Sequence, residues 1–517
     1  MQNNWKEQLH TLLNCDLKSL YPLARSLKRE LYFFVGPTNS GKTYAAMQEL
    51  QNSHCGTYLA PLRLLALEGY ETLLQNNIKA SLITGEEQIF DEESAHICST
   101  IEMIDFNMDV DVCVIDEVQM LSDEDRGWAW VNAIVGSPAK KIIMTGSVNA
   151  LDAIKKIALY LDEPLHIKKF KRINELKMLN RPTAMKEIKP YTALIAFSRN
   201  EVLKYKQKLS KFYNVSVLYG NLSPEVRKEE AKRFRTGKTN LLIATDAIAM
   251  GLNLPIKTIL FTTDTKFDGI SQRKLIANEV IQIAGRAGRY GHHEIGYIGA
   301  LNSRKILNHI KSQFESPIPT IKPPFSVKAT TFQIDELSNH LKTKSLHKIL
   351  NYFANNMKFS GPFKAANLKS MLQISKLLDS STTMKLEEKF LFAQAPVSIN
   401  ATIIKSAFMF YIKSVQNNKP VEYKLLTKIG KIAKDEFELL KAEDEVKKIS
   451  LYLWLSYKFP VHFKDTQKAI DTRTKLNLFI EKSLKANIKP KRQIRTANSN
   501  KNHKNRRSTN SRKRKFN

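Results

Sequence analysis

The sequence predicts an α/β protein with two consecutive parallel-sheet domains, then an all-helical region and a disordered basic tail. Three observations predict this arrangement. Short apolar runs alternate with helical patterns twice along the chain, which is typical of parallel sheets covered by helices on both faces. After the proline-rich stretch at 317–324 the texture changes, and residues 330–485 hold helical patterns rich in Leu, Lys and Phe with few strand signals. Residues 489–517 have almost no apolar side chains and cannot bury enough surface to fold alone.

The first part of the chain contains a short leading segment and the first sheet domain. Leucines recur at helical intervals in residues 1–30, so we expect this segment to be helical and to pack on the domain that follows. The domain itself is expected at residues 31–165. Its strands are predicted at the apolar runs 31–35, 56–60, 80–83, 95–99, 110–115 and 141–145.

The second sheet domain is expected at residues 166–305 and the helical domain at residues 306–488. A chain of 517 residues is too long for one core, so length alone predicts several domains. The strands of the second domain are predicted at the apolar runs 193–197, 216–219, 241–244, 258–261 and 294–299.

The net charge predicts a polyanionic partner. The chain has 81 basic and 50 acidic residues, a balance of +31, and nucleic acid is the commonest polyanion that such proteins bind. Residues 489–517 hold 12 basic residues and no acidic one, so the rest of the chain still carries 31 less 12, or +19. We expect the tail to tether polyanions without sequence preference; the alternative is a tail that only keeps the protein soluble.

Other features of the sequence exclude some classes of protein. No window approaches the ~18 uninterrupted apolar residues of a membrane span. The four cysteines form no C-x-x-C pair, which favours free thiols in a reducing compartment over a zinc site. The N-terminus has neither the profile of a secretory signal nor that of a transit peptide, so we expect a cytoplasmic protein.

A phosphate-binding loop follows the first predicted strand. It reads G-x-x-x-x-G-K-T and precedes a helical pattern at 44–50, which is the context that this motif needs. Glycines let backbone N–H groups converge on a polyphosphate, and the helix N-terminus adds positive charge. Lys42 is expected to reach the outer phosphates and Thr43 to bind Mg²⁺. The alternative is a strand-to-helix turn with a chance lysine. The loop residues are Gly36, Pro37, Thr38, Asn39, Ser40, Gly41, Lys42 and Thr43.

Two carboxylates end the predicted strand at 110–115. We expect Asp116 to hold Mg²⁺ and Glu117 to orient or deprotonate the attacking water. A strand that ends in Asp-Glu can also be a simple turn. The acidic residues at 123–125 lie in a polar loop, and we interpret them as solvated.

Two arginines in the second domain are the predicted counterpart of the phosphate loop. Arg286 and Arg289 lie three apart in the stretch Q-I-A-G-R-A-G-R, whose small residues allow close approach of a helix. Pointing from the second domain at a phosphate held by the first, they would neutralise charge in the transition state. The alternative is an exposed basic helix that packs through its small residues.

A further strand end lies between these elements. Thr245, directly after the predicted strand at 241–244, is placed to bind a nucleic-acid phosphate. Asp246 and Gly251 are expected to face the nucleotide cleft. This stretch would couple the two sites.

Together these motifs resemble those of superfamily-two DExH-box helicases, and specifically the suppressor-of-var family of RNA helicases of the mitochondrial degradosome and its bacterial relatives. The likeness is dense over residues 30–300 and continues at 387–397. The matching stretches are GPTNSGKT (36–43), APLRLLALE (60–68), TGEE (84–87), DEVQM (116–120), FSRNE (197–201), ATDAIAMGLNLP (244–255), KFDG (266–269) and QIAGRAGR (282–289).

The resemblance implies two RecA-like domains and a helical domain that hydrolyse ATP with Mg²⁺. It also implies unwinding of RNA duplexes with 3′-to-5′ polarity, with DNA or hybrid duplexes as further candidate substrates. It implies that Gln119 and the segment 145–147 link the ATP site to the nucleic acid. Residues implied along the nucleic-acid track are Pro61, Arg63, Thr100, Glu102, Ser198, Arg199 and Thr245. Residues implied in the ATP cleft, beyond the loop and its carboxylates, are Asp246, Gly251, Gln282, Arg286 and Arg289.

Some expectations rest on the resemblance alone. An exoribonuclease partner is one of them. Strand separation also needs a wedge, for which we expect a second-domain hairpin or loop near residues 290–295 that presses against the helical region. No glutamine element precedes Gly36 to recognise adenine, so the base preference is expected to be lax. The N-terminus fits a bacterial cytoplasmic member better than a mitochondrial precursor.

Rival functions stay open at this point. One is a scaffold whose ATPase switches RNA affinity without unwinding, and another is a DNA helicase or translocase. A P-loop kinase is disfavoured because it has no use for paired arginines on a second sheet domain.

Overall fold

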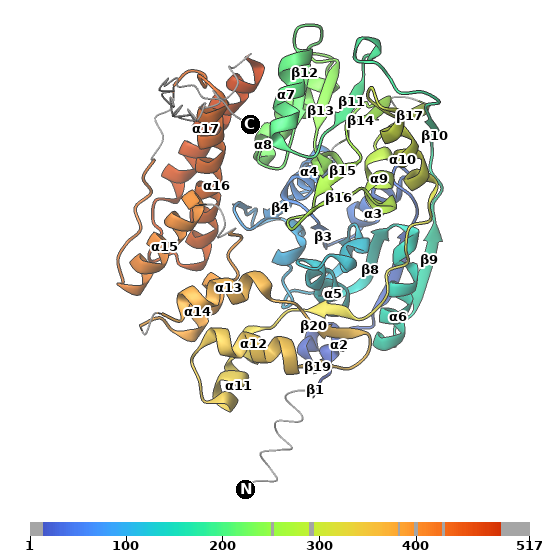
Figure 1. The fold of residues 1–517 in the computed structure, drawn as a ribbon. Coiled ribbons are helices and arrows are strands. Elements are labelled where there is room, and N and C mark those ends of the chain that lie inside the picture. The colour runs from blue at the N-terminus through green and yellow to red at the C-terminus, as the bar shows by residue number, and fades with distance from the viewer. Residues whose placement is uncertain are drawn as a thin grey trace, which may run out of the picture.

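The computed structural model describes residues 14–249, 253–288, 294–380, 383–397, 402–425 and 430–486. In it an eight-stranded sheet forms the first α/β unit (Figure 1). The strand order is β5-β4-β6-β3-β7-β8-β2-β9, and every neighbouring pair is parallel except β4–β5. The strands are β2 (Glu30–Val35), β3 (Gly56–Ala60), β4 (Ala80–Ile83), β5 (Gln88–Ile89), β6 (His96–Thr100), β7 (Val110–Ile115), β8 (Ala139–Gly146) and β9 (Leu165–Lys169).

Helices cover both faces of this sheet, because its central strands are apolar on both sides. In β7, Val112 and Val114 pack in the cluster that contains α3 and α4 side chains, whereas Cys113 and Ile115 pack with those of α5 and α6. Strands buried on both faces therefore appear as continuous apolar runs, which is why they were predictable. The helices are α3 (Lys42–Gln51), α4 (Arg63–Gln75), α5 (Gly127–Gly136) and α6 (Leu151–Leu161).

The second α/β unit has a six-stranded, fully parallel sheet in the order β10-β17-β14-β11-β13-β12. The strands are β10 (Glu175–Met178), β11 (Thr192–Ile195), β12 (Val215–Leu218), β13 (Leu241–Ala244), β14 (Thr258–Phe261) and β17 (Ile295–Ala300), and the antiparallel hairpin β15 (Thr265–Phe267) and β16 (Gln272–Lys274) lies outside the sheet. The helices are α7 (Arg199–Leu209), α8 (Pro224–Arg235), α9 (Ala277–Ala284) and α10 (Arg304–Glu315). The strands predicted for both sheets are confirmed to within two residues at either end.

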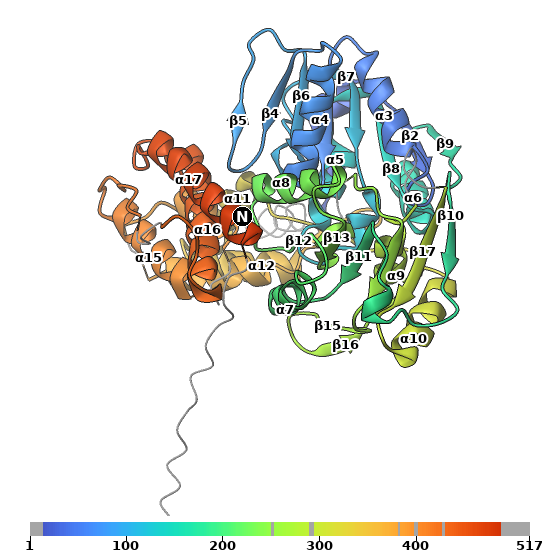
Figure 2. The same cartoon turned by 90° about the horizontal axis from the view of Figure 1, so that it is seen from above.

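The third region is mainly helical. Figure 2 shows its helices on one side of the two sheets. They are α11 (Thr331–Leu341), α12 (Leu346–Asn356), α13 (Lys369–Leu378), α14 (Leu386–Ala393), α15 (Thr402–Gln416), α16 (Glu436–Lys458) and α17 (Thr466–Lys485). The region also contains three short strands, β18 (Phe325–Val327), β19 (Lys358–Phe359) and β20 (Phe363–Ala365), which form a small sheet with β1 (Asn14–Cys15).

The second unit and the helical region pack as one body. A single apolar cluster contains Leu203 of α7, Ile449 of α16 and Leu476 of α17. At its edge the Oγ of Ser223, before α8, donates to Oδ1 of Asn477 at 2.9 Å. The helical region packs on the first unit as well, because Phe325, Val327 and Phe363 belong to that unit's apolar cluster. We refer to the direct contact between the two α/β units as the seam.

Two predicted boundaries need correction. Strand β9 pairs with β2 in the first sheet, so that sheet extends to Lys169 and not to residue 165. The sequence hid β9 because four of its five side chains are exposed and two are lysines. In the leading segment, residues 14–15 form a strand, Leu17–Leu20 a 3₁₀ turn and Pro22–Ser26 a helix (α2), so the helix expected over 1–30 is not continuous. Residues 1–13 and the tail 489–517 lie outside the described residues. Among the described helices, none is long and apolar enough to cross a membrane.

Candidate functional site

The phosphate loop has the backbone that its motif predicts. It connects β2 to α3, and Gly41 directly before the helix has φ 80°, a left-handed conformation that glycine adopts without strain. The Nζ of Lys42 donates to the carbonyl of Pro37 at 3.1 Å. The Oγ of Ser40 is buried and has no hydrogen-bond partner in the described part of the chain. An unpaired buried hydroxyl in this loop is suited to a phosphate oxygen.

Asp116 lies at the carboxyl end of β7, beside the loop. Its side chain is buried, with 2% of the residue exposed, and it accepts hydrogen bonds from Thr43 (3.2 Å), Tyr58 (3.1 Å) and Thr145. Burial, and then the neighbouring charge of Glu117, raise the pKa of this carboxyl above its usual value. A cation bound here would offset both effects. Thr43 and Asp116 thus present adjacent oxygen atoms, which are the ligands that Mg²⁺ prefers.

Glu117 and Gln119 connect this carboxylate to the end of β8. Glu117 has φ 56°, and its Oε2 accepts a hydrogen bond from Nε2 of Gln119. The Oε1 of Gln119 accepts from the backbone N–H of Ser147 at 3.2 Å. Gln119 therefore contacts the segment 145–147, and the expected link from these residues to the nucleic acid stays a prediction.

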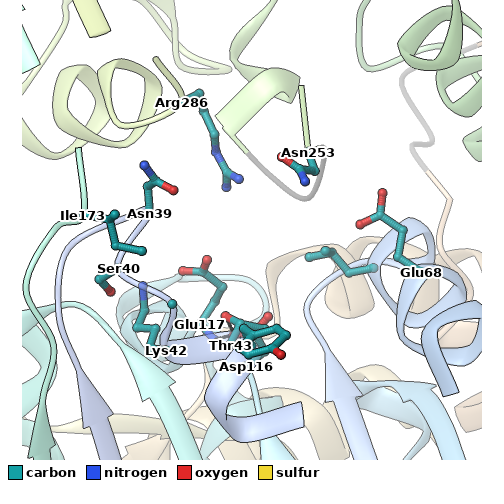
Figure 3. Close-up of a pocket in the computed structure, with 13 residues that line it drawn as sticks. Asn39, Ser40, Lys42, Thr43, Glu68, Asp116, Glu117, Ile173, Asn253 and Arg286 are labelled. Atoms are coloured by element: carbon teal, nitrogen blue, oxygen red, sulfur yellow. Dashed lines mark hydrogen bonds between the residues drawn. The ribbon is translucent and has the colours of Figure 1, made fainter. Parts of the chain in front are cut away.

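Arg286 faces this site from the second unit. It lines a cavity of about 590 Å³ together with the loop, Asp116 and Glu117. Figure 3 shows its guanidinium pointing into the cavity, opposite Lys42. The group is buried, which lowers its pKa, and Nη2 donates to the carbonyl of Ala249. Arg289 and Gly251 lie outside the described residues. The cavity is lined by Asn39, Ser40, Gly41, Lys42, Thr43, Tyr44, Leu65, Glu68, Asp116, Glu117, Ile173, Asn253 and Arg286.

The cavity is closed by direct contact between the loop and the chain around Arg286. Nδ2 of Asn39 donates to the carbonyl of Gly288 at 2.9 Å. A Cβ on Gly285 would overlap the hydroxyl of Thr38, so only glycine permits this approach. Sequence reasoning missed Arg172, which binds both sides of the contact; it lies in a linker that carries no motif.

Asp246 and Gln282 are not among the residues that line this cavity, contrary to expectation. Both line a second cavity of about 890 Å³ between the two units, together with Ser198 and Thr245. Asp246 opens a 3₁₀ turn, and its carboxylate pairs with Nζ of Lys266 on the β15–β16 hairpin at 3.0 Å. That ion pair turns the carboxylate toward the hairpin.

The first-domain residues implied along the nucleic-acid track lie together. Pro61, Arg63, Thr100 and Glu102 line a third cavity of about 530 Å³, which the helical region completes through Lys328, Trp454 and Lys458. Arg126 crosses its wall: Nη2 donates to the carbonyl of Pro61 at 2.7 Å, and Nε donates to Glu102 at 2.7 Å. Arg63 pairs with Glu86.

Arg199 lines the second cavity beside Ser198 and Thr245, and its guanidinium also pairs with a carboxylate of the helical region. Its Nε and Nη2 donate to the two carboxylate oxygens of Glu443 on α16, at 2.7 and 3.0 Å. Glu443 is fully buried and also accepts from the hydroxyl of Tyr219 at 2.7 Å. This bidentate pair fastens the second unit to the helical region. Sequence reasoning could not identify it because the two residues are 244 positions apart.

Two RecA-like α/β domains that close on a phosphate loop, with an arginine supplied across the seam, define a helicase-type ATPase. The DEXQ-box helicase domain of Suv3 matches residues 18–170, the helicase conserved C-terminal domain matches residues 168–291, and the SUV3 C-terminal domain matches residues 439–486. The chain belongs to the SUV3 family of ATP-dependent RNA helicases.

Two RNA helicases are similar to the chain over most of its length. The chain is 34% identical over 479 residues to the mitochondrial DExH-box ATP-dependent RNA helicase DExH16 of Arabidopsis thaliana, covering 90% of this chain and 83% of that protein. It is 33% identical to the mitochondrial helicase SUV3 of Saccharomyces cerevisiae, covering 88% of this chain and 64% of that protein. A solved structure of S. cerevisiae Dbp5 bound to RNA and ADP BeF3 has 17% identity and a TM-score of 0.42, and the match covers 61% of this chain and 88% of that one.

The relatives overturn the prediction of a cytoplasmic protein. Both helicases named above are mitochondrial. The prediction, and with it the suggestion of a bacterial member, took the start of the printed sequence as a guide to the compartment, and that start does not decide it.

Proposed function

We propose that ATP hydrolysis at the seam drives this helicase along RNA in the 3′-to-5′ direction and separates duplexes. The observation that supports this best is the single cavity lined by Lys42, Asp116, Glu117 and Arg286. A triphosphate in that cavity would be held by the first domain and completed by the body formed by the second domain and the helical region. ATP would strengthen closure, because its phosphates would add an anionic partner for Arg286 to the charges of Glu117 and Asp116, which already act on this arginine.

Each residue has a role that follows from its position. Lys42 would turn from the Pro37 carbonyl to the outer phosphates, and Thr43 and Asp116 would hold Mg²⁺, which neutralises charge on the phosphates when bound. Glu117, fixed through Gln119, would orient the attacking water and accept its proton. Arg286 would stabilise charge on the transferred phosphoryl group, an effect worth about 10³–10⁵ in rate for such arginines.

We assign RNA to the second and third cavities. Ser198 and Thr245 would contact the strand from the second domain, and Pro61, Arg63, Thr100 and Glu102 from the first. Arg199 is left out because Glu443 occupies its guanidinium. We propose domain limits at residues 30–169, 175–315 and 316–486, because α10 packs in the apolar cluster of the second unit through Ile310. An exoribonuclease partner and acceptance of DNA remain predictions from the family.

The test is the ATPase rate with and without RNA, for the wild type and for Lys42→Ala and Arg286→Ala. Both variants are expected to lose RNA-stimulated hydrolysis, and Arg286→Ala to keep nucleotide binding. Arg181→Ala is a matched control, because Arg181 is a largely exposed arginine that pairs with Glu187 at 2.9 Å. Wild-type turnover in either site variant would refute the site.

Unwinding is tested separately with RNA duplexes that carry a 3′ or a 5′ overhang. Only the 3′ overhang with ATP is expected to give strand separation. Separation with a non-hydrolysable analogue, or none with ATP, would favour an ATP-switched RNA-binding scaffold. Stronger stimulation of turnover by DNA than by RNA would favour a DNA translocase.

A further inference from the structure

Arg172 connects the two halves of the ATP site. It lies between β9 and β10, in the linker that leads from the first sheet to the second. On the first-domain side, Nη1 donates to the carbonyl of Thr38 in the phosphate loop at 2.9 Å. On the second-domain side, Nη1 donates to the carbonyl of Gly285 at 3.2 Å, and Nη2 donates to that of Ala287 at 2.6 Å.

The two second-domain carbonyls belong to the residues on either side of Arg286. The Gly285 carbonyl belongs to the peptide group directly before Arg286, and the Ala287 carbonyl to the second peptide group after it, so the two bonds restrain the backbone from which the Arg286 side chain leaves. The hydrogen bond from Asn39 to Gly288 adds a third anchor to the same short segment. The segment follows α9 directly, and carbonyls at a helix C-terminus attract a cation.

The guanidinium of Arg172 donates hydrogen bonds to several backbone carbonyls at once and forms no ion pair in the described part of the chain. Its hydrogen-bond acceptors in the described part of the chain are backbone carbonyls and the Thr38 hydroxyl, and no carboxylate there lies within ion-pair distance. Burial lowers its pKa to about 10, so the group stays charged at neutral pH. Lysine, a single ammonium, cannot span the same set of carbonyls.

We propose that Arg172 is a positioning residue that orients Arg286 toward the ATP phosphates by binding the carbonyls of Gly285, Ala287 and Thr38. The proposal rests on the proposed role of Arg286. It gives the linker a role beyond connecting the domains, because a single side chain of the linker binds both the phosphate loop and the Arg286 segment. A misplacement of about 1 Å at a reacting centre can cost on the order of 100-fold in rate.

The experiment compares Arg172→Met with Lys171→Met in the full chain. Lys171 is the exposed neighbour, so its replacement removes the same charge without touching the hydrogen bonds that Arg172 donates. We expect Arg172→Met to lower RNA-stimulated kcat by about 10- to 100-fold while the Kd for a fluorescent ATP analogue changes less than about threefold. Lys171→Met is expected to match the wild type. Equal kcat for the two variants would overturn the proposal.

A second measurement separates positioning from general packing. ADP with aluminium fluoride mimics the phosphoryl group during transfer. The enhancement of its affinity for the protein over that of ADP alone therefore reports on the contact that Arg286 makes with this group. Arg172→Met is expected to lose that enhancement as Arg286→Ala does, and the double variant to lose no more than Arg286→Ala alone. Additive losses would overturn the proposal, because Arg172 would then act independently.

Two controls keep the outcomes distinct. If Arg172→Met lacks the native melting transition, Arg172→Lys is used in its place. The proposal is supported if Arg172→Lys lowers kcat and the affinity enhancement in the wild-type background and lowers neither further in the Arg286→Ala background. Wild-type values for Arg172→Lys overturn it. If Arg286→Ala itself keeps turnover and enhancement, the proposed function fails. If Arg286→Ala loses them and Arg172→Met does not, only the inference about Arg172 fails.

Discussion

Replacing Arg199 by alanine distinguishes a structural role for this residue from a role in RNA binding. In the structure, Arg199 pairs through two nitrogens with the fully buried Glu443, at 2.7 and 3.0 Å. Removing one partner of a buried pair leaves an uncompensated charge and costs about 3–5 kcal/mol. The Tyr219 hydroxyl remains as a donor to Glu443, and the Arg199 side chain is 13% exposed, so the lower end, about 3 kcal/mol, is expected.

The assay is urea unfolding followed by tryptophan fluorescence, because Trp454 on α16 reports on the helical region. Glu443→Gln in the same assay is the matched change, and a smaller loss of about 1–3 kcal/mol is expected, since its amide still accepts from Arg199 and Tyr219. RNA affinity is then measured against salt concentration. The structural argument is refuted if Arg199→Ala leaves the unfolding midpoint unchanged and reduces the slope of log K against log salt by about 0.7, the signature of a lost phosphate contact to a single strand.

Three further predictions concern other parts of the chain. Burial lowers the pKa of Lys328 from 10.5 to about 8, so the native state loses this proton at a lower pH than the unfolded state does. The unfolding free energy of the wild type relative to Lys328→Met should therefore rise by about 3 kcal/mol between pH 8 and pH 10.5. Parallel curves of unfolding free energy against pH for the two proteins would contradict this. A chain ending at Ile488 should bind RNA more weakly with a smaller salt slope and unchanged basal ATPase, and an unchanged slope would remove the tail from RNA binding. Gly285→Ala should lower kcat by about tenfold or more because its methyl overlaps the Thr38 hydroxyl, and wild-type kcat would show that the two domains need no such approach.

The parts of the fold that sequence reasoning predicted share one physical property. The strands of both sheets that are buried on two faces appear as apolar runs, and helices between them restrict the topology. β9 and β10 were missed because they are edge strands that contain polar and exposed side chains and so have no such run. The β15–β16 hairpin was missed because its strands have three residues each and lie outside the sheet.

The residues of the site also differ in whether a local sequence pattern or a distant partner fixes the direction of the side chain. Lys42, Asp116, Glu117 and Arg286 were predictable because each belongs to a motif whose local backbone fixes where its side chain points. Asp246 was misplaced because its direction depends on an ion pair with Lys266, twenty residues along the chain. Arg172 and Arg199 act through partners far away in sequence, and no local pattern specifies those partners.

The small sheet formed by β1, β19, β20 and β18 affects how the molecule can assemble. Residues 14–15 pair with residues 358–359, and the N–H of Ser360 donates to the carbonyl of Cys15 at 3.0 Å. The start of the described chain therefore waits, during synthesis, until more than three hundred further residues have emerged. Both α/β domains that form the ATP site can fold by then, but the small sheet that packs on the first of them is still incomplete. A chain that stops short of residue 358 cannot complete the small sheet, and its unpaired strand edges should then be open to aggregation. The helical region therefore also completes the fold of the first α/β unit at a late stage of synthesis.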